Sequence, residues 1–290
     1  MTTARAKRNT RKYGWADWIG LLPFFAFCFA FEIIPVIGLL HSSFTGPQGE
    51  LSLHNYLRII TPLVINSFQN SFKLSLATAL SGMVIGSLVA YALVGVRNTF
   101  VREAVTALAD VATNFGGAPL AFAFIITLGS TGVVTLVLQK FFGISLYPRF
   151  RIYSITGLAI AYLYFQIPLM VLLMVPALLG LRREWREAAI NLGASSLEYW
   201  LYIGLPLLLP SLLGGFMLLF ANSFGAYATA WTLTGPDINL VTVQIAALLR
   251  GEVQLEPKMA DAIAAVSLLI MAFCVTSYQL TIGRTRRLLR

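Results

Sequence analysis

Few side chains in this sequence have the types and spacing that chemistry requires. Three carboxylates, Glu32, Asp110 and Asp261, lie within long apolar stretches, where a charge is costly and therefore tends to be functional. They are the candidates for an ion relay, although only Glu32 falls well inside its stretch. His41 and His54 stand alone in the sequence. The pattern therefore predicts no catalytic residue and no metal site.

The sequence also lacks the usual phosphate-binding loop. No G-x-x-x-x-G-K-[ST] segment occurs, and glycine is nowhere followed by lysine. That loop is the common means by which a protein cradles the phosphates of ATP. We therefore expect no cofactor to be bound by this chain, and any ATP-driven work would need hydrolysis on another polypeptide.

One polar segment between two apolar stretches, residues 181–206, carries an informative spacing. It reads LRREWREAAINLGASSLEYWLYIGLP and opens with a strongly helix-forming run. Gly193 stands where such a helix would end in a left-handed turn, and Ser195 and Glu198 have the spacing of a capping box. The segment predicts a helix–turn–helix outside the membrane, with small alanines on one face. A solvated hairpin that merely links two spans is the alternative interpretation.

The composition indicates the elements that must position this segment. The chain is 58% hydrophobic and 11% charged, with a mean hydropathy of +0.77, whereas soluble domains are about a quarter charged. A spanning helix needs roughly 20 mostly apolar residues. The sequence predicts an all-α membrane protein with six transmembrane helices, at Trp18–Leu40, Phe72–Val94, Ala104–Leu128, Tyr153–Leu179, Leu207–Thr232 and Met259–Ile282.

The third of these stretches carries two features that complicate it. It contains the Gly116-Gly117 pair, and the apolar patch Val133–Leu138 competes as its far end. The basic first residues precede a long apolar run, which we interpret as a retained helix because a cleavable signal peptide has a shorter apolar core. We therefore expect a transmembrane domain at residues 18–282 between basic tails at 1–17 and 283–290.

The charge distribution predicts how the helices are oriented. Six spans place both termini on one side, and that side carries fourteen of the 21 Lys and Arg residues. Because positively charged loops stay in the cytoplasm, both termini are predicted to be cytoplasmic. A net charge of +9 is also typical of nucleic-acid-binding proteins, but here the basic residues gather at the chain ends and in short breaks between apolar runs. We expect no nucleic acid to bind.

Polar residues on otherwise apolar helices are the candidates for a solute path. The fifth predicted span and its two neighbours supply them, at Asn114, Gln166, Asn222, Ser223, Tyr227 and Thr229. The alternative for each one is a hydrogen bond between helices, which is common in membrane proteins.

The polar segment at 181–206 resembles a known motif. Its Glu187-Ala188-Ala189, then Gly193 three residues later, and Ile203-x-Leu205-Pro206 after nine more, match the EAA loop of bacterial ABC-importer permeases at every fixed position. The resemblance implies the type I importer permease fold. It also implies that the loop couples the chain to an ATPase subunit, through Glu184, Glu187, Ala188, Ala189, Gly193 and Ala194.

The same resemblance implies partners and a location. The chain would pair with a second permease subunit and dock two ATP-binding-cassette subunits, which use ATP and Mg. An extracytoplasmic solute-binding protein would deliver the cargo, and membrane lipid would surround the bundle. The location would be the bacterial cytoplasmic (inner) membrane, which the chain crosses several times.

The cargo is the least determined part of the resemblance. The form Glu-Ala-Ala-x-x-Leu-Gly-Ala-Ser, together with residues 233–245, resembles permeases of the polyamine, phosphonate and iron type. A carbohydrate-type importer permease is the first alternative. An ion-coupled secondary transporter is the alternative from a different class, and it would need the intramembrane carboxylates named above.

Overall fold

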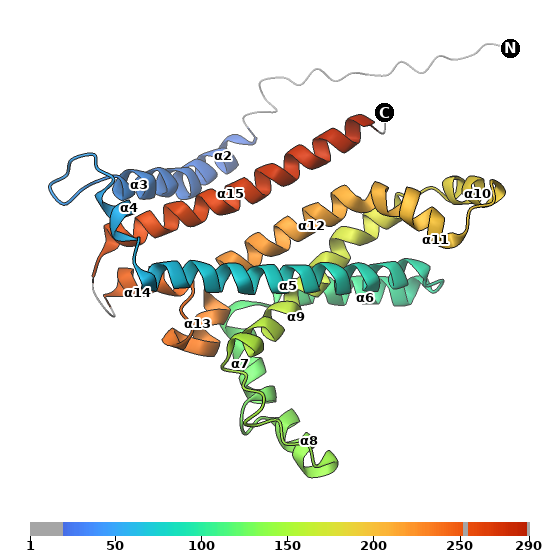
Figure 1. The fold of residues 1–290 in the computed structure, drawn as a ribbon, viewed down its shortest axis with the longest axis horizontal. Coiled ribbons are helices and arrows are strands. Elements are labelled where there is room, and N and C mark those ends of the chain that lie inside the picture. The colour runs from blue at the N-terminus through green and yellow to red at the C-terminus, as the bar shows by residue number, and fades with distance from the viewer. Residues whose placement is uncertain (1–19, 252–254, 289–290) are drawn as a thin grey trace.

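The computed structural model describes residues 20–251 and 255–288 and is almost entirely helical (Figure 1). The described part contains six helices that are long and apolar enough to cross a membrane. The predicted tail at 1–17 lies outside the described residues, and residues 283–288 are the last turns of the final helix. The candidate spans are Leu22–Ser43, Pro62–Gly95, Gly117–Phe142, Ile155–Leu179, Ser196–Gly225 and Pro257–Ser277.

The helices follow one another with short connections. In chain order they are α2 (Leu22–Cys28), the π-helix η1 (Phe29–Ile33), α3 (Ile34–Ser43), α4 (His54–Arg58), α5 (Pro62–Gly95), α6 (Thr99–Asn114), α7 (Gly117–Leu128), α8 (Val133–Phe142), α9 (Ile155–Leu179), α10 (Arg183–Asn191), α11 (Ser196–Tyr199), the π-helix η2 (Trp200–Gly204), α12 (Leu205–Gly225), α13 (Ala228–Thr234), the 3-10 helix η3 (Gly235–Asp237), α14 (Val241–Arg250) and α15 (Pro257–Leu288).

Helices α5, α9 and α12 form the centre of the bundle. α5 has 34 residues and is therefore about 51 Å long. Its buried face is a row of small residues, and a Cβ at Gly86 would come within 2.5 Å of the Met170 Cβ on α9. Gly82 lies against Gln166 on α9 and Leu219 on α12. Small residues thus let three backbones approach closely, which is how membrane helices gain packing energy in the absence of a hydrophobic effect.

The third predicted span is wrong as a single helix. α6 ends at Asn114, and α7 begins at Gly117 after the extended residue Gly116. Gly117 has φ of +71°, which glycine adopts at little cost. α6 packs along α9, whereas α7 packs on α13 and leads to α8, which projects away from the bundle (Figure 1). The glycine pair that complicated this predicted span is the point at which the chain changes direction.

The fifth predicted span also breaks. α12 ends at Gly225, and α13 begins at Ala228 after the extended residue Ala226. The chain then passes through α13, η3 and α14. Residues Ala228–Asp237 and Val241–Arg250 meet at a bend of 78°. Side chains fix this bend to α5, because Asn239 Nδ2 donates to the Leu63 carbonyl at 2.7 Å and Ser71 Oγ accepts from the Val241 N–H at 2.9 Å.

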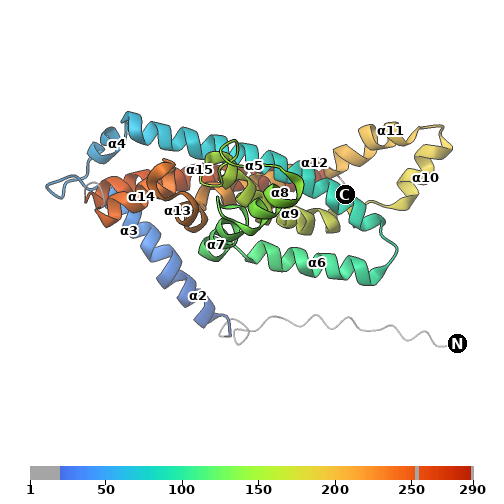
Figure 2. The ribbon, with the colours of Figure 1, turned by 90° about the horizontal axis from the view of Figure 1, so that it is seen from below.

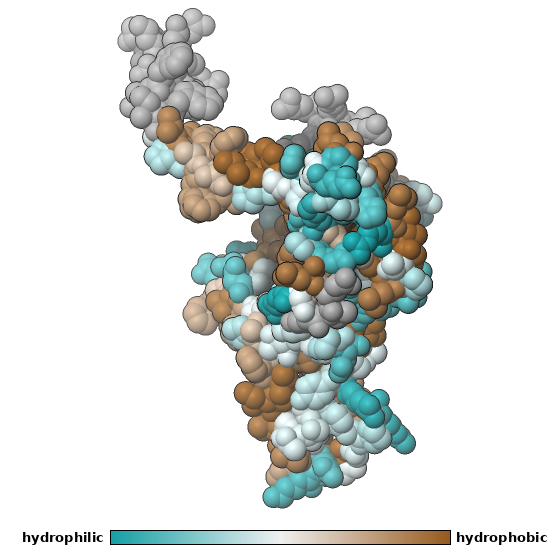
Figure 3. Space-filling model, turned by 90° about the vertical axis from the view of Figure 1, so that its left-hand side faces the viewer, coloured by the Kyte–Doolittle hydropathy of each residue, from teal (hydrophilic) through white to brown (hydrophobic). Residues whose placement is uncertain are grey.

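The first span stands apart from the others. α3 packs against α15, but no residue of α2 or η1 is buried, and α2 diverges from the bundle (Figure 2). Glu32 lies within η1 with an exposed side chain. Figure 3 looks at the bundle end opposite to α10 and α11, where polar side chains gather over the facing end and apolar side chains cover the flanks.

The close approach of α5 and α9 can be tested at Gly86. In Gly86→Ala the new methyl group would meet Met170 and the Ile167 carbonyl, which lies 2.8 Å away. Such overpacking costs about 1–3 kcal/mol, so the melting temperature of the detergent-solubilised protein should fall by several degrees. Gly38→Ala is the matched control, because a Cβ at that helical glycine meets no atom within 4 Å. Equal melting temperatures for the two variants would contradict the packing described here.

Candidate functional site

The predicted helix–turn–helix is present, and we refer to residues 183–204 as the hairpin. Its first helix, α10, ends in a Schellman motif around Gly193, whose φ is +87°. The Gly193 N–H donates to the Ile190 carbonyl at 2.9 Å, and the Ala194 N–H donates to the Ala189 carbonyl at 3.0 Å. These two bonds satisfy carbonyls that the end of a helix leaves unpaired.

The second half of the hairpin begins at a capping box. The Ser195 N–H donates to Glu198 Oε2 at 2.7 Å, and Ser195 Oγ accepts from the Glu198 N–H at 3.3 Å. The helix then continues through the π-turn η2 into α12. In that turn a Cβ at Gly204 would lie 2.5 Å from the Trp200 ring. The second half of the hairpin and α12 therefore form one connected helical element from Ser196 to Gly225.

The predicted coupling residues differ in exposure. Glu184, Glu187, Ala188 and Gly193 are exposed on the hairpin surface, and Ala194 is half-buried. Ala189 is only 6% exposed. Its side chain therefore packs inside the hairpin, and in this conformation it supports the docking surface without lying on it.

Sequence reasoning missed the apolar part of this surface. Leu192 is 88% exposed at the turn, and Leu197 and Tyr202 are 68% and 78% exposed on the second half of the hairpin. Ile190 is half-exposed beside them. The signal was available, because large apolar side chains in a segment assigned outside the membrane indicate a surface that a protein partner covers.

A small cavity lies where the two helix breaks meet, and we refer to it as the break cavity. Its volume is about 220 Å³, and residues from α6–α7, α9 and the α12–α13 junction line it, namely Thr113, Gly116, Gly117, Phe165, Asn222, Ala226, Tyr227, Ala228 and Thr229. Just below the break, Ser223 contacts Thr78, which is close to the midpoint of α5. The cavity is therefore near the middle of the bundle.

Side chains of other helices donate to backbone carbonyls at both breaks, and one of these carbonyls, that of Ala226, lies between α12 and α13. The Ala226 carbonyl accepts from the Tyr162 hydroxyl at 3.0 Å and from Thr242 Oγ1 at 3.3 Å. The Gly117 carbonyl accepts from Thr229 Oγ1 at 3.3 Å. Non-helical backbone in a membrane is tolerated only where protein or a water-filled cavity satisfies it, and at Ala226 two side chains of the protein do so.

The structure separates the predicted path residues into two groups. Asn222, Tyr227 and Thr229 line the break cavity. The Tyr227 hydroxyl is buried without a hydrogen-bond partner in the described part of the chain. Its ring faces the Arg250 guanidinium, whose central carbon lies 5.6 Å from the ring centroid.

The other predicted path residues do not line the cavity. Gln166 is fully buried, and its Nε2 donates to Thr78 Oγ1 at 3.2 Å. Thr78 Oγ1 in turn lies 3.1 Å from Ser223 Oγ. These three residues join α9, α5 and α12 in the way that the alternative interpretation expected. Asn114 is exposed near the end of α6 and donates to the Asp110 carbonyl at 2.9 Å.

The three carboxylates that the sequence placed in apolar stretches are not gathered at one site, and Asp110 lies on α6, which is not among the candidate spans. Glu32 lies on η1, Asp110 on α6 and Asp261 on α15, and none of them lines the break cavity. In the part of the chain that the structure describes, no group of three or more His, Cys, Asp or Glu residues could hold a metal ion. The arrangement offers hydroxyl and amide groups that could contact a passing solute.

Comparison with known proteins decides the family. Residues 82–287 match the family described as binding-protein-dependent transport system inner membrane component, which is more than half of the chain's 290 residues. The chain belongs to this family. The resemblance that was inferred from the EAA motif is thereby confirmed, and the chain is a multi-pass permease component of a transport system.

Two curated relatives illustrate the range of this permease family. The probable sulfate transport system permease protein cysT of Helicosporidium sp. subsp. Simulium jonesii is 26% identical over 182 residues, which cover 60% of this chain and 62% of that protein. The spermidine/putrescine transport system permease protein PotC of Escherichia coli is 25% identical over 263 residues, covering 87% and 89%. The matched region thus spans less than two thirds of the first relative and most of the second.

Two solved structures confirm the predicted permease fold. A bacterial ABC transporter involved in the import of the acidic polysaccharide alginate has a chain that superposes with a TM-score of 0.70 at 19% identity, covering 95% of this chain and 96% of that one. A bacterial alginate ABC transporter in complex with an alginate pentasaccharide-bound periplasmic protein gives 0.69 at 16% identity, covering 91% and 92%. The all-α, six-helix importer permease fold is therefore shown.

The buried network around Thr78 predicts a structural phenotype. Thr78→Val keeps the side-chain shape but leaves Gln166 Nε2 and Ser223 Oγ without their shared partner. The loss should destabilise the permease by about 1–2 kcal/mol, measured as a lower melting temperature in detergent. Transport per folded molecule should stay unchanged. Thr127→Val is the control, because Thr127 bonds only within its own helix and is exposed.

Proposed function

We propose that this chain is one permease subunit of an ABC importer and forms half of a path for a small polar solute. A second permease subunit supplies the other half, and an extracytoplasmic binding protein delivers the solute. ATP is hydrolysed on two separate subunits. The family match, the fold and the EAA-type hairpin all support this proposal.

The hairpin is the proposed contact with the ATPase. It combines exposed acidic groups, Glu184 and Glu187, with the exposed apolar side chains of Leu192 and Leu197. A surface of this kind supports a docked partner better than it supports a solvated link, because exposed apolar patches mark interaction sites. In this proposal the protein lies in the inner membrane of a bacterium. The hairpin end of the bundle faces the cytoplasm, in agreement with the orientation expected from the charge distribution.

The break cavity is the proposed segment of the solute path. In many transporters the binding site lies near the middle of the membrane, where discontinuous helices expose polar backbone groups. Here two discontinuous pairs, α6–α7 and α12–α13, meet at the cavity, and the unpartnered Tyr227 hydroxyl is buried at its wall. That hydroxyl is the observation that favours a solute contact over pure packing.

The charges around the cavity bear on the cargo. No Asp or Glu lines it among the described residues, and the Arg250 guanidinium lies on the Tyr227 ring. A polyamine would meet no carboxylate of the described residues there. We therefore favour an oxyanion, such as a phosphonate or sulfate, or an uncharged polar solute over a polyamine. A polyamine path would need carboxylates from the second permease.

Docking of the ATPase predicts a phenotype for Gly193→Ala and Glu187→Ala. An alanine at position 193 would have to adopt the left-handed backbone that Gly193 has, at a cost of about 1–2 kcal/mol. Glu187→Ala removes an exposed carboxylate. Each variant should retain less ATPase on co-purification, while the permease itself stays monodisperse. Gly143→Ala is a matched control, because Gly143 also has positive φ (+64°) with open space around it but caps α8.

Two outcomes would overturn the importer proposal. One is full retention of the ATPase by both hairpin variants, and the other is the absence of any ATPase with the wild-type chain. If uptake is then abolished by a protonophore and not by inactivating a co-expressed ATPase, the ion-coupled alternative is supported.

The solute path predicts a phenotype for Tyr227→Phe and Asn222→Ala. Uptake of labelled sulfate, putrescine and alginate oligosaccharides should be measured in cells that express the whole transporter. We expect the KM for the transported solute to rise several-fold in both variants while ATPase retention is unchanged. Tyr164→Phe is the control, because Tyr164 lies on α9 outside the cavity lining. Wild-type uptake in both variants would remove the cavity from the path.

A further inference from the structure

Two adjoining cavities lie at the hairpin end of the bundle, and the function proposed above uses neither. The first, the arginine cavity, has a volume of about 410 Å³, and Arg102, Arg182, Arg183 and Arg186 line part of its wall. The second, the apolar groove, has a volume of about 340 Å³ between α5, α9 and α12. Both are lined by Tyr91, Leu178 and Trp200, so the two spaces adjoin at these side chains.

The arginine cavity gathers positive charge without compensation. No carboxylate lines it, and none of its four guanidinium groups is in an ion pair within the described residues. Arg182 contacts the Trp185 ring at 5.9 Å, and Arg102 also borders a neighbouring cavity that Glu103 and Asp110 line. The N-terminus of α10 also lies at this wall, and no side chain caps it. Its positive helix dipole adds to the potential of the cavity.

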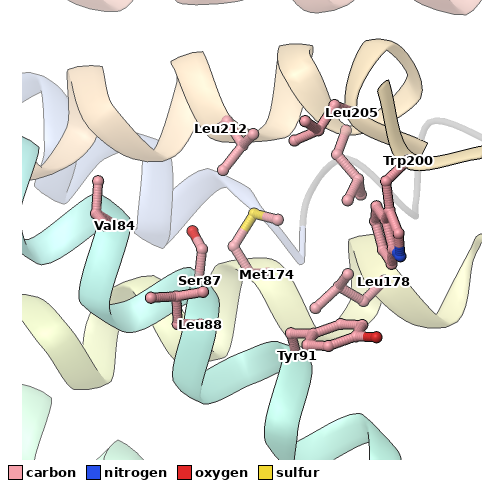
Figure 4. Close-up of a pocket in the computed structure, with 10 residues that line it drawn as sticks. Val84, Ser87, Leu88, Tyr91, Met174, Leu178, Trp200, Leu205 and Leu212 are labelled. Atoms are coloured by element: carbon pink, nitrogen blue, oxygen red, sulfur yellow. The ribbon is translucent and has the colours of Figure 1, made fainter. Parts of the chain in front are cut away.

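The apolar groove has almost no polar lining. Its walls are Val84 and Leu88 from α5, Met174 and Leu178 from α9, and leucines of α12 (Figure 4). The exception is Ser87, whose hydroxyl points into the groove and has no hydrogen-bond partner in the described chain. Trp200 and Tyr91 stand at the end that adjoins the arginine cavity, with ring centroids 5.3 Å apart. Aromatic residues at this depth are typical of the membrane–water interface.

We propose that an anionic phospholipid occupies these two spaces. Its phosphate lies among the arginines and one acyl chain lies in the groove. The chemistry of each space fits one end of such a molecule, and guanidinium groups bind phosphate in a bidentate manner. Basic pockets between transmembrane helices on the cytoplasmic side are suited to acidic headgroups. The lipid chemistry is inferred from the two cavities, and the cytoplasmic placement of the site rests on the orientation proposed above.

The position of the site gives the lipid a structural consequence. Arg182, Arg183 and Arg186 belong to α10 and its N-cap, whereas the groove belongs to the bundle. A bound lipid would tie the hairpin to α5 and α9 at a point where Trp200 already links hairpin and bundle. We therefore expect the lipid to stabilise the hairpin against the membrane domain.

The test is lipid retention by the intact transporter in native mass spectrometry. The complex is purified in mild detergent with equal amounts of phosphatidylglycerol and phosphatidylcholine of the same chain length. We expect phosphatidylglycerol to be retained preferentially. The double variant R182Q/R186Q should retain at least five-fold less phosphatidylglycerol than the wild type. Arg97→Gln is the matched control, because Arg97 is exposed at the same end of the bundle and lines neither cavity.

A second variant separates the lipid from other occupants. Leu212→Trp should fill the groove and reduce retention of long-chain phosphatidylglycerol, while a dihexanoyl form still binds. Competition by inorganic phosphate with no effect of Leu212→Trp would instead identify a free-anion site. Equal retention of the two headgroups would overturn the proposal. The proposal would also be overturned if a segment of the second permease covered the groove. In that case Leu212→Cys would cross-link to that subunit and no lipid would be retained.

Discussion

The structure depends on one constraint, namely that no backbone carbonyl may be left unpaired where no water can reach it. Helices meet this constraint internally, so an interrupted helix needs donors from elsewhere. At the α12–α13 break the Tyr162 hydroxyl and Thr242 Oγ1 both donate to the Ala226 carbonyl. At the α6–α7 break Thr229 Oγ1, which belongs to α13, donates to the Gly117 carbonyl. Each break is therefore stabilised by other helices, and the second depends directly on the element that follows the first.

Close packing along α5 lets side chains of one helix form hydrogen bonds with another. Because Gly82 and Gly86 carry no side chain, α9 and α12 lie close enough for Gln166 and Ser223 to bond to the same hydroxyl of Thr78. Hydrogen bonds between membrane helices contribute only about 0.6 kcal/mol each on average, so the van der Waals contacts at the glycines carry much of the packing. The polar network adds to this packing and joins the three helices close to the break at Ala226.

The parts of this molecule that could be predicted from sequence are those set by local chemistry. Gly193, Ser195 and Glu198 act on their own neighbours, so the hairpin and its caps could be read from spacing alone. The break at Ala226 could not, because the donor from Tyr162 that stabilises it lies 64 residues away in the sequence. Likewise Gln166 and Tyr227 are both polar residues in apolar stretches. Only the packing shows that the first joins helices and the second faces a cavity.

The same connections constrain how the hairpin can act on the break cavity. The helical element from Ser196 to Gly225 joins them, and its 30 residues extend over about 45 Å. A displacement of the hairpin can pass along this element to Ser223, which is bonded to Thr78 just before the break. Beyond that point the Ala226 carbonyl has two donors, whereas the Gly117 carbonyl has one donor at 3.3 Å. A movement of α12 therefore acts directly on α9 and α14, which hold the Ala226 carbonyl, and it reaches the α7 side of the cavity through α13, which packs against α7.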